Sequence, residues 1–287
     1  MLYEKISGFS DEIDPNFDKQ IEGLKENGMK YLEIRGVDGK NVSLLTMNEM
    51  NAAKAKLDRA GLKVSSIGSP VGKTKIDGDF EEDLKVAENI LLAAEIFETR
   101  YIRMFSFYIP RETREDGSYK KYRGEVLARL EKLFDMADKR GFVLCHENES
   151  DLYGESPEDC ADIAAYFGGG IKLVFDPANF VGHGYETYPY AYNLMKDHIE
   201  YFHIKDIKKG AGTVPAGSGD GMVKEILTDA IRCGFNNFLS VEPHLKVFAG
   251  LDNLSRNGSP NIKDGYASHA EAFRAAKSAL DDILAAI

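Results

Sequence analysis

Gly141-Phe-Val-Leu-Cys-His-Glu-Asn-Glu149 is the most informative stretch of this sequence. Its four apolar residues, 142–145, run directly into a polar cluster. A short apolar run of this kind is typical of a β-strand that is buried on both faces, as in a parallel sheet covered by helices. The polar residues that follow, Glu147 among them, are therefore expected at the carboxyl end of a buried strand.

Three later segments repeat this pattern. They are Ile-Lys-Leu-Val-Phe-Asp at 171–176, Ile-Glu-Tyr-Phe-His at 199–203 and Asn-Phe-Leu-Ser-Val-Glu at 237–242. Each is a short run of apolar, β-branched or aromatic residues that ends in a residue able to bind a metal. Asp176, His203 and Glu242 are thus expected at the ends of successive strands, as Glu147 is.

Strands and helices are predicted to alternate along the whole chain. The predicted strands lie near residues 5–13, 29–35, 62–67, 99–107, 142–145, 171–176, 199–203 and 237–242. The predicted helices lie near residues 14–27, 46–60, 80–97, 121–140, 157–166, 188–196, 222–233 and 266–284. Strict alternation implies parallel strands joined by right-handed crossovers, and eight such units favour a closed (β/α)8 TIM barrel of the α/β class over an open sheet.

Length and composition agree with one barrel. The chain has 287 residues, 43% of them apolar, and a TIM barrel of roughly 250 residues would use nearly all of it. No linker-like tract interrupts the alternation, so we expect a single domain over residues 1–287. In such a barrel the ends of the strands meet on one face, where Glu147, Asp176, His203 and Glu242 would converge.

Charge and cysteine content restrict the possible partners and location. A net charge of −11 argues against non-specific binding to nucleic acid, which needs several lysines and arginines on phosphates. The three cysteines are odd in number and lack C-x-x-C spacing, which favours a reducing compartment. No stretch approaches the ~18 apolar residues of a membrane span. We therefore expect a soluble, cytoplasmic protein with no membrane partner.

Three carboxylates and one imidazole would form a hard, oxygen-rich metal site. Such a donor set suits Mn²⁺, Mg²⁺ or Co²⁺, with Zn²⁺ also possible. Each residue alone has a simpler interpretation, since a strand-end carboxylate is often a helix cap or a surface charge, and a histidine is often packed in the core. Three carboxylates gathered at one rim without a cation would be costly, however, and this favours one divalent ion.

An ordered set of motifs resembles the xylose isomerase-like barrels, the superfamily of sugar phosphate isomerases and epimerases that includes ketose 3-epimerases, inosose-processing enzymes and endonuclease IV. The motifs are HEN at 146–148, FDPANF at 175–180, YFHIKD at 201–206, PAGSG at 215–219 and SVEPH at 240–244. The resemblance covers nearly the whole chain. Three positions differ from the pattern of some members, with Glu149 and Asn179 in place of histidines and Lys209 in place of an arginine.

The resemblance implies one divalent metal held by Glu147, Asp176, His203 and Glu242. It also implies that the two glutamates act as the acid and base on either side of the substrate. A metal on the ketone and hydroxyl oxygens would ease removal of the neighbouring C–H proton by stabilising an enediolate. The leading expectation is therefore a metal-dependent isomerase or epimerase of a free or phosphorylated sugar.

Further residues are candidates for binding the carbohydrate substrate. They are Glu33, Arg103, Asn179, His183, Lys205, Asp206 and His244. Glu33 and Arg103 could instead form structural ion pairs, and the two histidines lie in rim loops, where a solvated histidine is the more common case. Gly217 and Gly219 lack the strand and helix context of a dinucleotide fingerprint, so no nicotinamide cofactor is expected.

Three other functions remain open from the sequence. An inosose-type dehydratase would use the same enolate to expel a β-hydroxyl group. An endonuclease IV-like phosphodiesterase would need a histidine-rich site with several zinc ions, against which six histidines and the negative charge argue. The third is a sugar-binding barrel without catalysis. The loop at 243–264 and the aromatic run at 185–192 are candidate contacts in a homo-oligomer.

Overall fold

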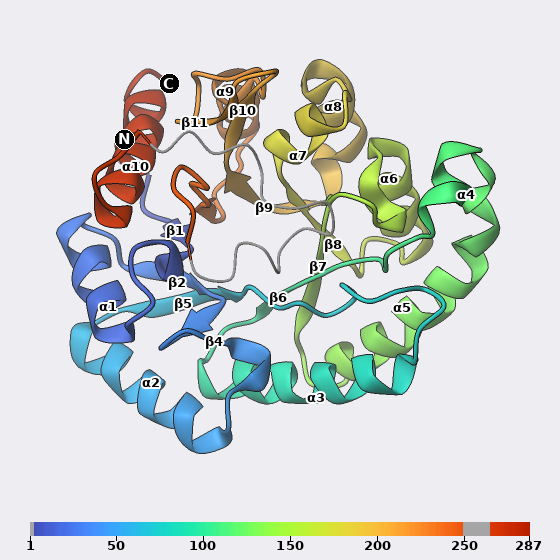
Figure 1. The fold of residues 1–287 in the computed structure, drawn as a ribbon, viewed down its shortest axis with the longest axis horizontal. Helices are drawn as coiled ribbons and strands as arrows, with labels where there is room; N and C mark the ends of the chain where they lie inside the picture. Colours follow the sequence, from blue (N-terminus) through green and yellow to red (C-terminus); the bar gives the residue numbers. More distant parts are fainter. Residues whose placement is uncertain (1–2, 249–264) are drawn as a thin grey trace.

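The computed structural model describes residues 3–248 and 265–287. Its centre is a sheet of eight parallel strands, each hydrogen-bonded to the next. In sheet order these are β1 (Ile6–Gly8), β12 (Leu239–Val241), β9 (Ile199–Ile204), β8 (Lys172–Phe175), β7 (Val143–Glu147), β6 (Tyr101–Met104), β5 (Lys63–Ile67) and β2 (Tyr31–Ile34). The end strands β1 and β2 lie side by side, so the barrel is nearly closed (Figure 1).

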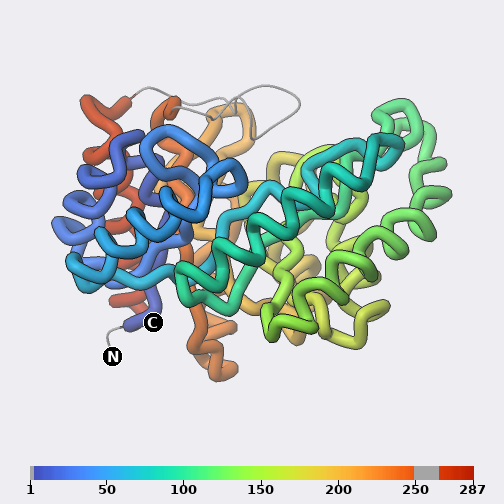
Figure 2. Tube along the Cα trace, turned by 90° about the horizontal axis from the view of Figure 1, so that it is seen from below, coloured from blue at the N-terminus to red at the C-terminus, as the bar shows by residue number. Residues whose placement is uncertain are grey.

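Helices follow the strands and surround the barrel (Figure 1). They are α1 (Phe17–Glu26), α2 (Met47–Ala60), α3 (Phe80–Ile96), α5 (Arg123–Asp138), α6 (Pro157–Tyr166), α8 (Tyr192–Met195), α9 (Val223–Arg232) and α10 (His269–Ala285). In Figure 2 the red α10 lies beside the blue α1, and Arg274 of α10 is 3.7 Å from Glu26 of α1. The predicted (β/α)8 TIM barrel is therefore confirmed.

Local sequence signals explain where these helices begin and end. Thr46 and Glu49 form a reciprocal capping box at the start of α2, and Gly61 ends that helix with a φ of 70°. Ser156 caps α6 ahead of a proline in its first turn. The helix predicted from residue 14 begins at Phe17, because the Asn16 side chain accepts a hydrogen bond from the Lys19 N–H and caps it.

Several connections contain short elements that the sequence did not predict. The first predicted strand, 5–13, ends early: β1 stops at Gly8 and a 3-10 turn, Ser10–Glu12, follows. The connection between the strand predicted to end at residue 176 and the helix predicted from residue 188 contains a short helix, α7 (Pro177–Gly182). Another, α4 (Arg111–Glu115), follows β6, and two antiparallel hairpins pair β3 (Gly36–Val37) with β4 (Lys40–Asn41) and β10 (Asp206–Lys208) with β11 (Gly212–Val214). These departures from simple strand–helix units all lie in loops, which tolerate such insertions.

The barrel interior changes from apolar to charged along the strands. Cys145, Val174 and Tyr201 pack together inside the barrel and are almost fully buried. Because side chains alternate along a strand, the residues two positions after Cys145 and Tyr201 face the same interior. Those residues are Glu147 and His203, both buried. Glu147 and His203 therefore lie next to the buried cluster of Cys145, Val174 and Tyr201.

Two further expectations concern surfaces. No helix within residues 3–248 and 265–287 combines the length and apolar character needed to cross a membrane. Of the segments expected to contact a second subunit, residues 249–264 lie outside the described residues.

Candidate metal centre

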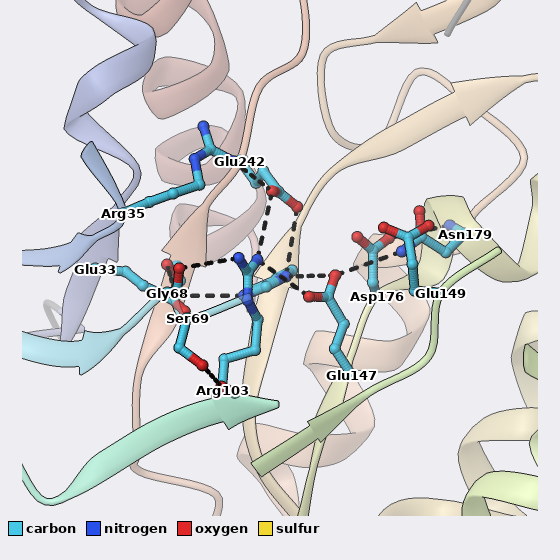
Figure 3. Close-up of polar contacts among 12 residues, drawn as sticks. Glu33, Arg35, Gly68, Ser69, Arg103, Glu147, Glu149, Asp176, Asn179 and Glu242 are labelled. Atoms are coloured by element: carbon cyan, nitrogen blue, oxygen red, sulfur yellow. Dashed lines mark hydrogen bonds and ion pairs between the residues drawn. The ribbon is translucent and has the colours of Figure 1, made fainter. Parts of the chain in front are cut away.

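Glu147, Asp176, His203 and Glu242 come together at the carboxyl ends of β7, β8, β9 and β12. Each offers one ligand atom, and these atoms all lie within 4.8 Å of one another. All four side chains are buried. Figure 3 shows the carboxylates of Glu147, Asp176 and Glu242 turned toward a common centre. The donors predicted from the ends of separate strands therefore form one cluster of a size that one metal ion can bridge.

The two carboxylate oxygens of Asp176 have different partners, one on the backbone of α7 and one in the cluster. Oδ1 accepts a hydrogen bond from the backbone N–H of Asn179 at 3.1 Å, and so caps α7. Oδ2 faces the ammonium group of Lys205 at 2.6 Å. The Asn148 side chain accepts from the Asp176 N–H and donates to its carbonyl, both at 2.9 Å. Asn148, which the sequence analysis did not single out as a site residue, therefore fixes the backbone of Asp176.

His203 lies between carboxylates on both sides of its ring. Nδ1 is 3.1 Å from Glu147 Oε1 and 3.4 Å from Glu242 Oε2. Nε2 points the other way and is 3.3 Å from Glu33 Oε2. Glu33 is fully buried and faces the imidazole nitrogen that points away from Glu147 and Glu242. The substrate contact expected for Glu33 stays a prediction.

Three permanent cations surround the carboxylates. Arg103 Nη1 is 3.1 Å from Glu147 Oε2, and its Nη2 donates to the Gly68 carbonyl. Lys205 reaches Glu242 Oε2 at 3.1 Å as well as Asp176. The third cation is Arg35.

Arg35 Nη1 is 3.1 Å from Glu242 Oε1, while Nε and Nη2 of the same guanidinium donate to both oxygens of Asp11. Arg35 was not predicted as a site residue. It stands two residues after Glu33, at the end of β2, and this alternate spacing was the available signal that both side chains turn to the same face.

Burial and these cations shift the pKa values in opposite directions. Burial alone would raise the pKa of Glu147, but His203 and Arg103 beside it lower the value to about 2. Burial raises the pKa of Asp176 to about 7, in spite of Lys205. Burial would lower the pKa of His203, but Glu147, Glu33 and Glu242 raise it well above its ordinary value. The buried carboxylates of the cluster therefore favour a bound cation.

A second group, Glu12, Glu242 and His244, also brings its ligand atoms within 4.8 Å of one another. Arg35 already lies in this group, because Nη2 is 3.2 Å from Glu12 Oε1 and Nη1 is 3.1 Å from Glu242. His244 has a positive φ of 45°. Its backbone N–H donates to Glu12, and its backbone carbonyl accepts from the Thr213 hydroxyl. The guanidinium supplies the positive charge here, so we take the first group as the candidate metal centre.

Two other predicted site residues lie next to the cluster or near its mouth. Asn179 Nδ2 donates to the Asn148 carbonyl at 2.8 Å and is 3.4 Å from Glu147 Oε1. His183 lies at the rim, where Nε2 is 2.7 Å from Ser150 Oγ. His183 is therefore not part of the cluster.

Asp206, a candidate for substrate binding, lies next to the glycine-rich loop. Its Oδ2 accepts N–H groups from Gly217 at 2.9 Å and Gly219 at 3.0 Å, and its Oδ1 accepts from Gly221 at 2.9 Å. The side chain is buried beneath the glycine-rich loop. Both oxygens thus anchor that loop, which accounts for Asp206 without a substrate contact.

Residues 21–275 match the family described as xylose isomerase-like TIM barrel. No curated protein matches the chain by sequence.

Many solved structures are similar in fold. The probable 3-DHS dehydratase AsbF from Bacillus anthracis is 15% identical with a TM-score of 0.70, covering 96% of this chain and 98% of that one. D-allulose 3-epimerase from Methylomonas sp., solved with D-allulose, is 15% identical with a TM-score of 0.72, covering 98% and 96%. The IOLI protein, solved with a zinc atom, is 16% identical with a TM-score of 0.71, covering 98% of both chains.

Proposed function

The chain belongs to the xylose isomerase-like TIM barrel family, and from this premise we propose that it is a divalent-metal-dependent isomerase or epimerase of a sugar or sugar phosphate. The observation that carries the proposal is that the ligand atoms of three carboxylates and one imidazole lie within 4.8 Å of one another, next to the buried cluster of Cys145, Val174 and Tyr201. D-allulose in a structure of similar fold supports a carbohydrate substrate.

The donor set fits a divalent metal. Three carboxylates and one histidine without a thiolate suit Mn²⁺, Mg²⁺ or Co²⁺, and Zn²⁺ is possible as well. Burial raises the pKa of Asp176, and the carboxylates of Glu147, Glu33 and Glu242 raise that of His203 against the effect of burial. A bound cation would stabilise the ionised carboxylates. When bound, such an ion would act as a Lewis acid on a substrate carbonyl and would acidify the adjacent C–H bond.

Glu147 and Glu242 are the proposed proton-transfer residues. They come from β7 and from the end of β12, on either side of β8 and β9 in the sheet. The pKa values of both carboxyl groups are below the ordinary value, so both are ionised and able to accept a proton at neutral pH. One glutamate would remove the C–H proton, and the other would return a proton to the opposite face or to a neighbouring carbon.

Cationic and polar neighbours would hold the substrate. Lys205 and Arg103 lie next to the glutamates and are suited to stabilise negative charge on a substrate oxygen. Asn179 and His244 border the same centre and are proposed to contact hydroxyl groups. His183 would contact only a substrate that extends to the rim.

A dehydratase is the second candidate. The observation that favours it is the group of three cations, Arg35, Arg103 and Lys205, around the carboxylates, because an enolate that expels a β-hydroxyl group also needs a stabilised negative charge. The probable dehydratase of similar fold is consistent with this chemistry on the scaffold.

Isotope exchange would test and separate these candidates. The purified protein is loaded with Mn²⁺ or Mg²⁺ and incubated in D₂O with free ketoses, their phosphates and an inosose, and the products are followed by NMR. Incorporation of deuterium with a change of configuration or of carbonyl position supports the isomerase or epimerase. Loss of water supports the dehydratase. A metal-loaded protein that exchanges no proton in any member of the panel would contradict both.

Metal binding is expected to weaken as the pH falls. Asp176 has a pKa of about 7 and that of His203 is well above 6.5, so both bind protons more strongly near neutrality than ordinary side chains do. A metal must displace these protons, and each displaced proton lowers the apparent affinity by about tenfold per pH unit below the pKa of its group. Calorimetric titration with Mn²⁺ between pH 8 and pH 6 checks this expectation, which an unchanged affinity would contradict.

A further inference from the structure

Glu33 is a carboxylate that lies completely inside the barrel. It is in β2, points toward the centre (Figure 3) and has no exposed surface. Within residues 3–248 and 265–287, the ion pair that Glu33 forms is with His203, at 3.3 Å from Nε2. Burying an ionised carboxylate costs several kcal/mol unless hydrogen bonds compensate for the lost water. Packing alone therefore does not explain a carboxylate at position 33.

Three donors satisfy this carboxylate. Oε1 accepts from the Tyr201 hydroxyl at 2.9 Å, and Oε2 accepts from the Ser240 hydroxyl at 2.7 Å and faces His203 Nε2. Tyr201 is held in turn by Ser66, whose hydroxyl is 3.1 Å from the phenol oxygen. The donors come from β9 and β12, so neighbouring strands clamp Glu33 in one orientation against the imidazole.

The two nitrogens of His203 have distinct surroundings. Nδ1 faces Glu147 and Glu242, the other members of the candidate metal centre, at 3.1 and 3.4 Å. Nε2 faces Glu33 on the opposite side of the ring. A neutral imidazole that donates from one nitrogen has its lone pair on the other, so an acceptor fixed at Nε2 selects the form that can bind a metal through Nδ1.

We propose that Glu33 is a positioning residue that keeps the His203 proton on Nε2 and so directs Nδ1 to the metal. This inference rests on the proposed metal-dependent function. It is an alternative to the direct substrate contact that the sequence suggested for Glu33. A carboxylate behind the imidazole also increases the basicity of the ligand, and loss of such a partner typically weakens metal binding by about 10- to 100-fold.

Metal affinity in matched variants tests this role. Glu33→Ala removes the acceptor, and we expect calorimetric titration with Zn²⁺ to show about a 10- to 100-fold lower affinity than in the wild type. Glu33→Gln retains an amide oxygen that can accept from Nε2, so its loss should be smaller. Ser240→Ala removes a donor to Glu33 but leaves the contact with His203, and we expect it to bind Zn²⁺ nearly as tightly as the wild type.

A spectroscopic signal separates positioning from general stability. In the zinc-loaded protein with ¹⁵N-labelled histidine, we expect a hydrogen-bonded Nε2–H proton of His203 in the wild type and in Glu33→Gln, and its loss in Glu33→Ala. Asp83→Asn is the control for loss of a buried carboxylate, because Asp83 is also buried but contacts Thr74. This variant should bind metal as the wild type does.

The outcomes distinguish the inference from the function on which it rests. If the wild type binds zinc and both Glu33 variants bind it equally tightly, the positioning role is wrong and the metal centre stands. If the wild type itself binds no divalent metal, the proposed function fails. If Glu33→Ala does not fold, Glu33→Gln is compared with the wild type instead. An unchanged zinc affinity together with a His203 Nε2 that carries no proton would overturn the proposal.

Discussion

Replacing Glu147 with glutamine is expected to lower turnover by about 10³-fold or more. The substitution removes a proposed metal ligand and a proposed proton-transfer group in one step, and general acid–base catalysis alone typically contributes about 10²- to 10⁴-fold. The amide is nearly isosteric, so the contact of Asn179 with this side chain can rearrange with little cost. Initial rates with the substrate that the isotope-exchange panel identifies measure the effect.

The corresponding change at Glu242 tests whether the two glutamates act on opposite faces of the substrate. In an epimerase with one glutamate on each face of the substrate, Glu242→Gln should abolish the change of configuration yet retain slow exchange of the proton that Glu147 removes. Glu200→Gln is the control. Glu200 lies near the beginning of the strand that carries His203 and contacts Asn237, so this variant should keep the wild-type rate. Wild-type turnover in Glu147→Gln would contradict the proposed mechanism.

Removal of divalent metal is expected to abolish turnover and to lower thermal stability. The centre gathers three buried carboxylates, and a cation bound only in the folded state stabilises that state by about 2.7 kcal/mol at 100 times its dissociation constant. Calorimetry in the presence of EDTA and then of excess Mn²⁺ should show a melting temperature several degrees higher with the metal. Restoring the metal should restore turnover.

Asp176→Ala provides the control for that experiment. It removes one proposed ligand together with the cap of α7, so the variant should start from a lower melting temperature and gain little from added Mn²⁺. A wild-type melting temperature that is the same in EDTA and in excess Mn²⁺, Mg²⁺, Co²⁺ and Zn²⁺ would argue against a metal centre at these residues.

The sequence predicted much of this arrangement because of the periodic structure of a parallel barrel. Apolar runs followed by Glu147, Asp176, His203 and Glu242 indicated strand ends, and parallel strands bring their ends to one face. The four ligand atoms do lie within 4.8 Å of one another. Their function as metal ligands stays a prediction, as does the acid and base pairing of the two glutamates.

Contacts between distant strands were beyond the reach of the sequence. Arg35 and Asn148 were not predicted as site residues, since an arginine after a strand and an asparagine in a loop have many ordinary roles. Asp206 was a candidate for substrate binding, and its carboxylate accepts N–H groups from Gly217, Gly219 and Gly221. A carboxylate near glycines carries no signal in one sequence that tells whether backbone N–H groups or a ligand will satisfy it.

The barrel and the shared face of the four donors could be predicted from the chain alone, because alternation and the residues at strand ends are local properties. Which charged groups contact one another depends on the folded arrangement. Glu33 and His203 are 170 positions apart, and their contact depends on strand register and on the curvature of a nearly closed sheet. Those quantities arise from packing of the whole molecule, so the acceptor at Nε2 of His203 became visible only when the strands were placed together.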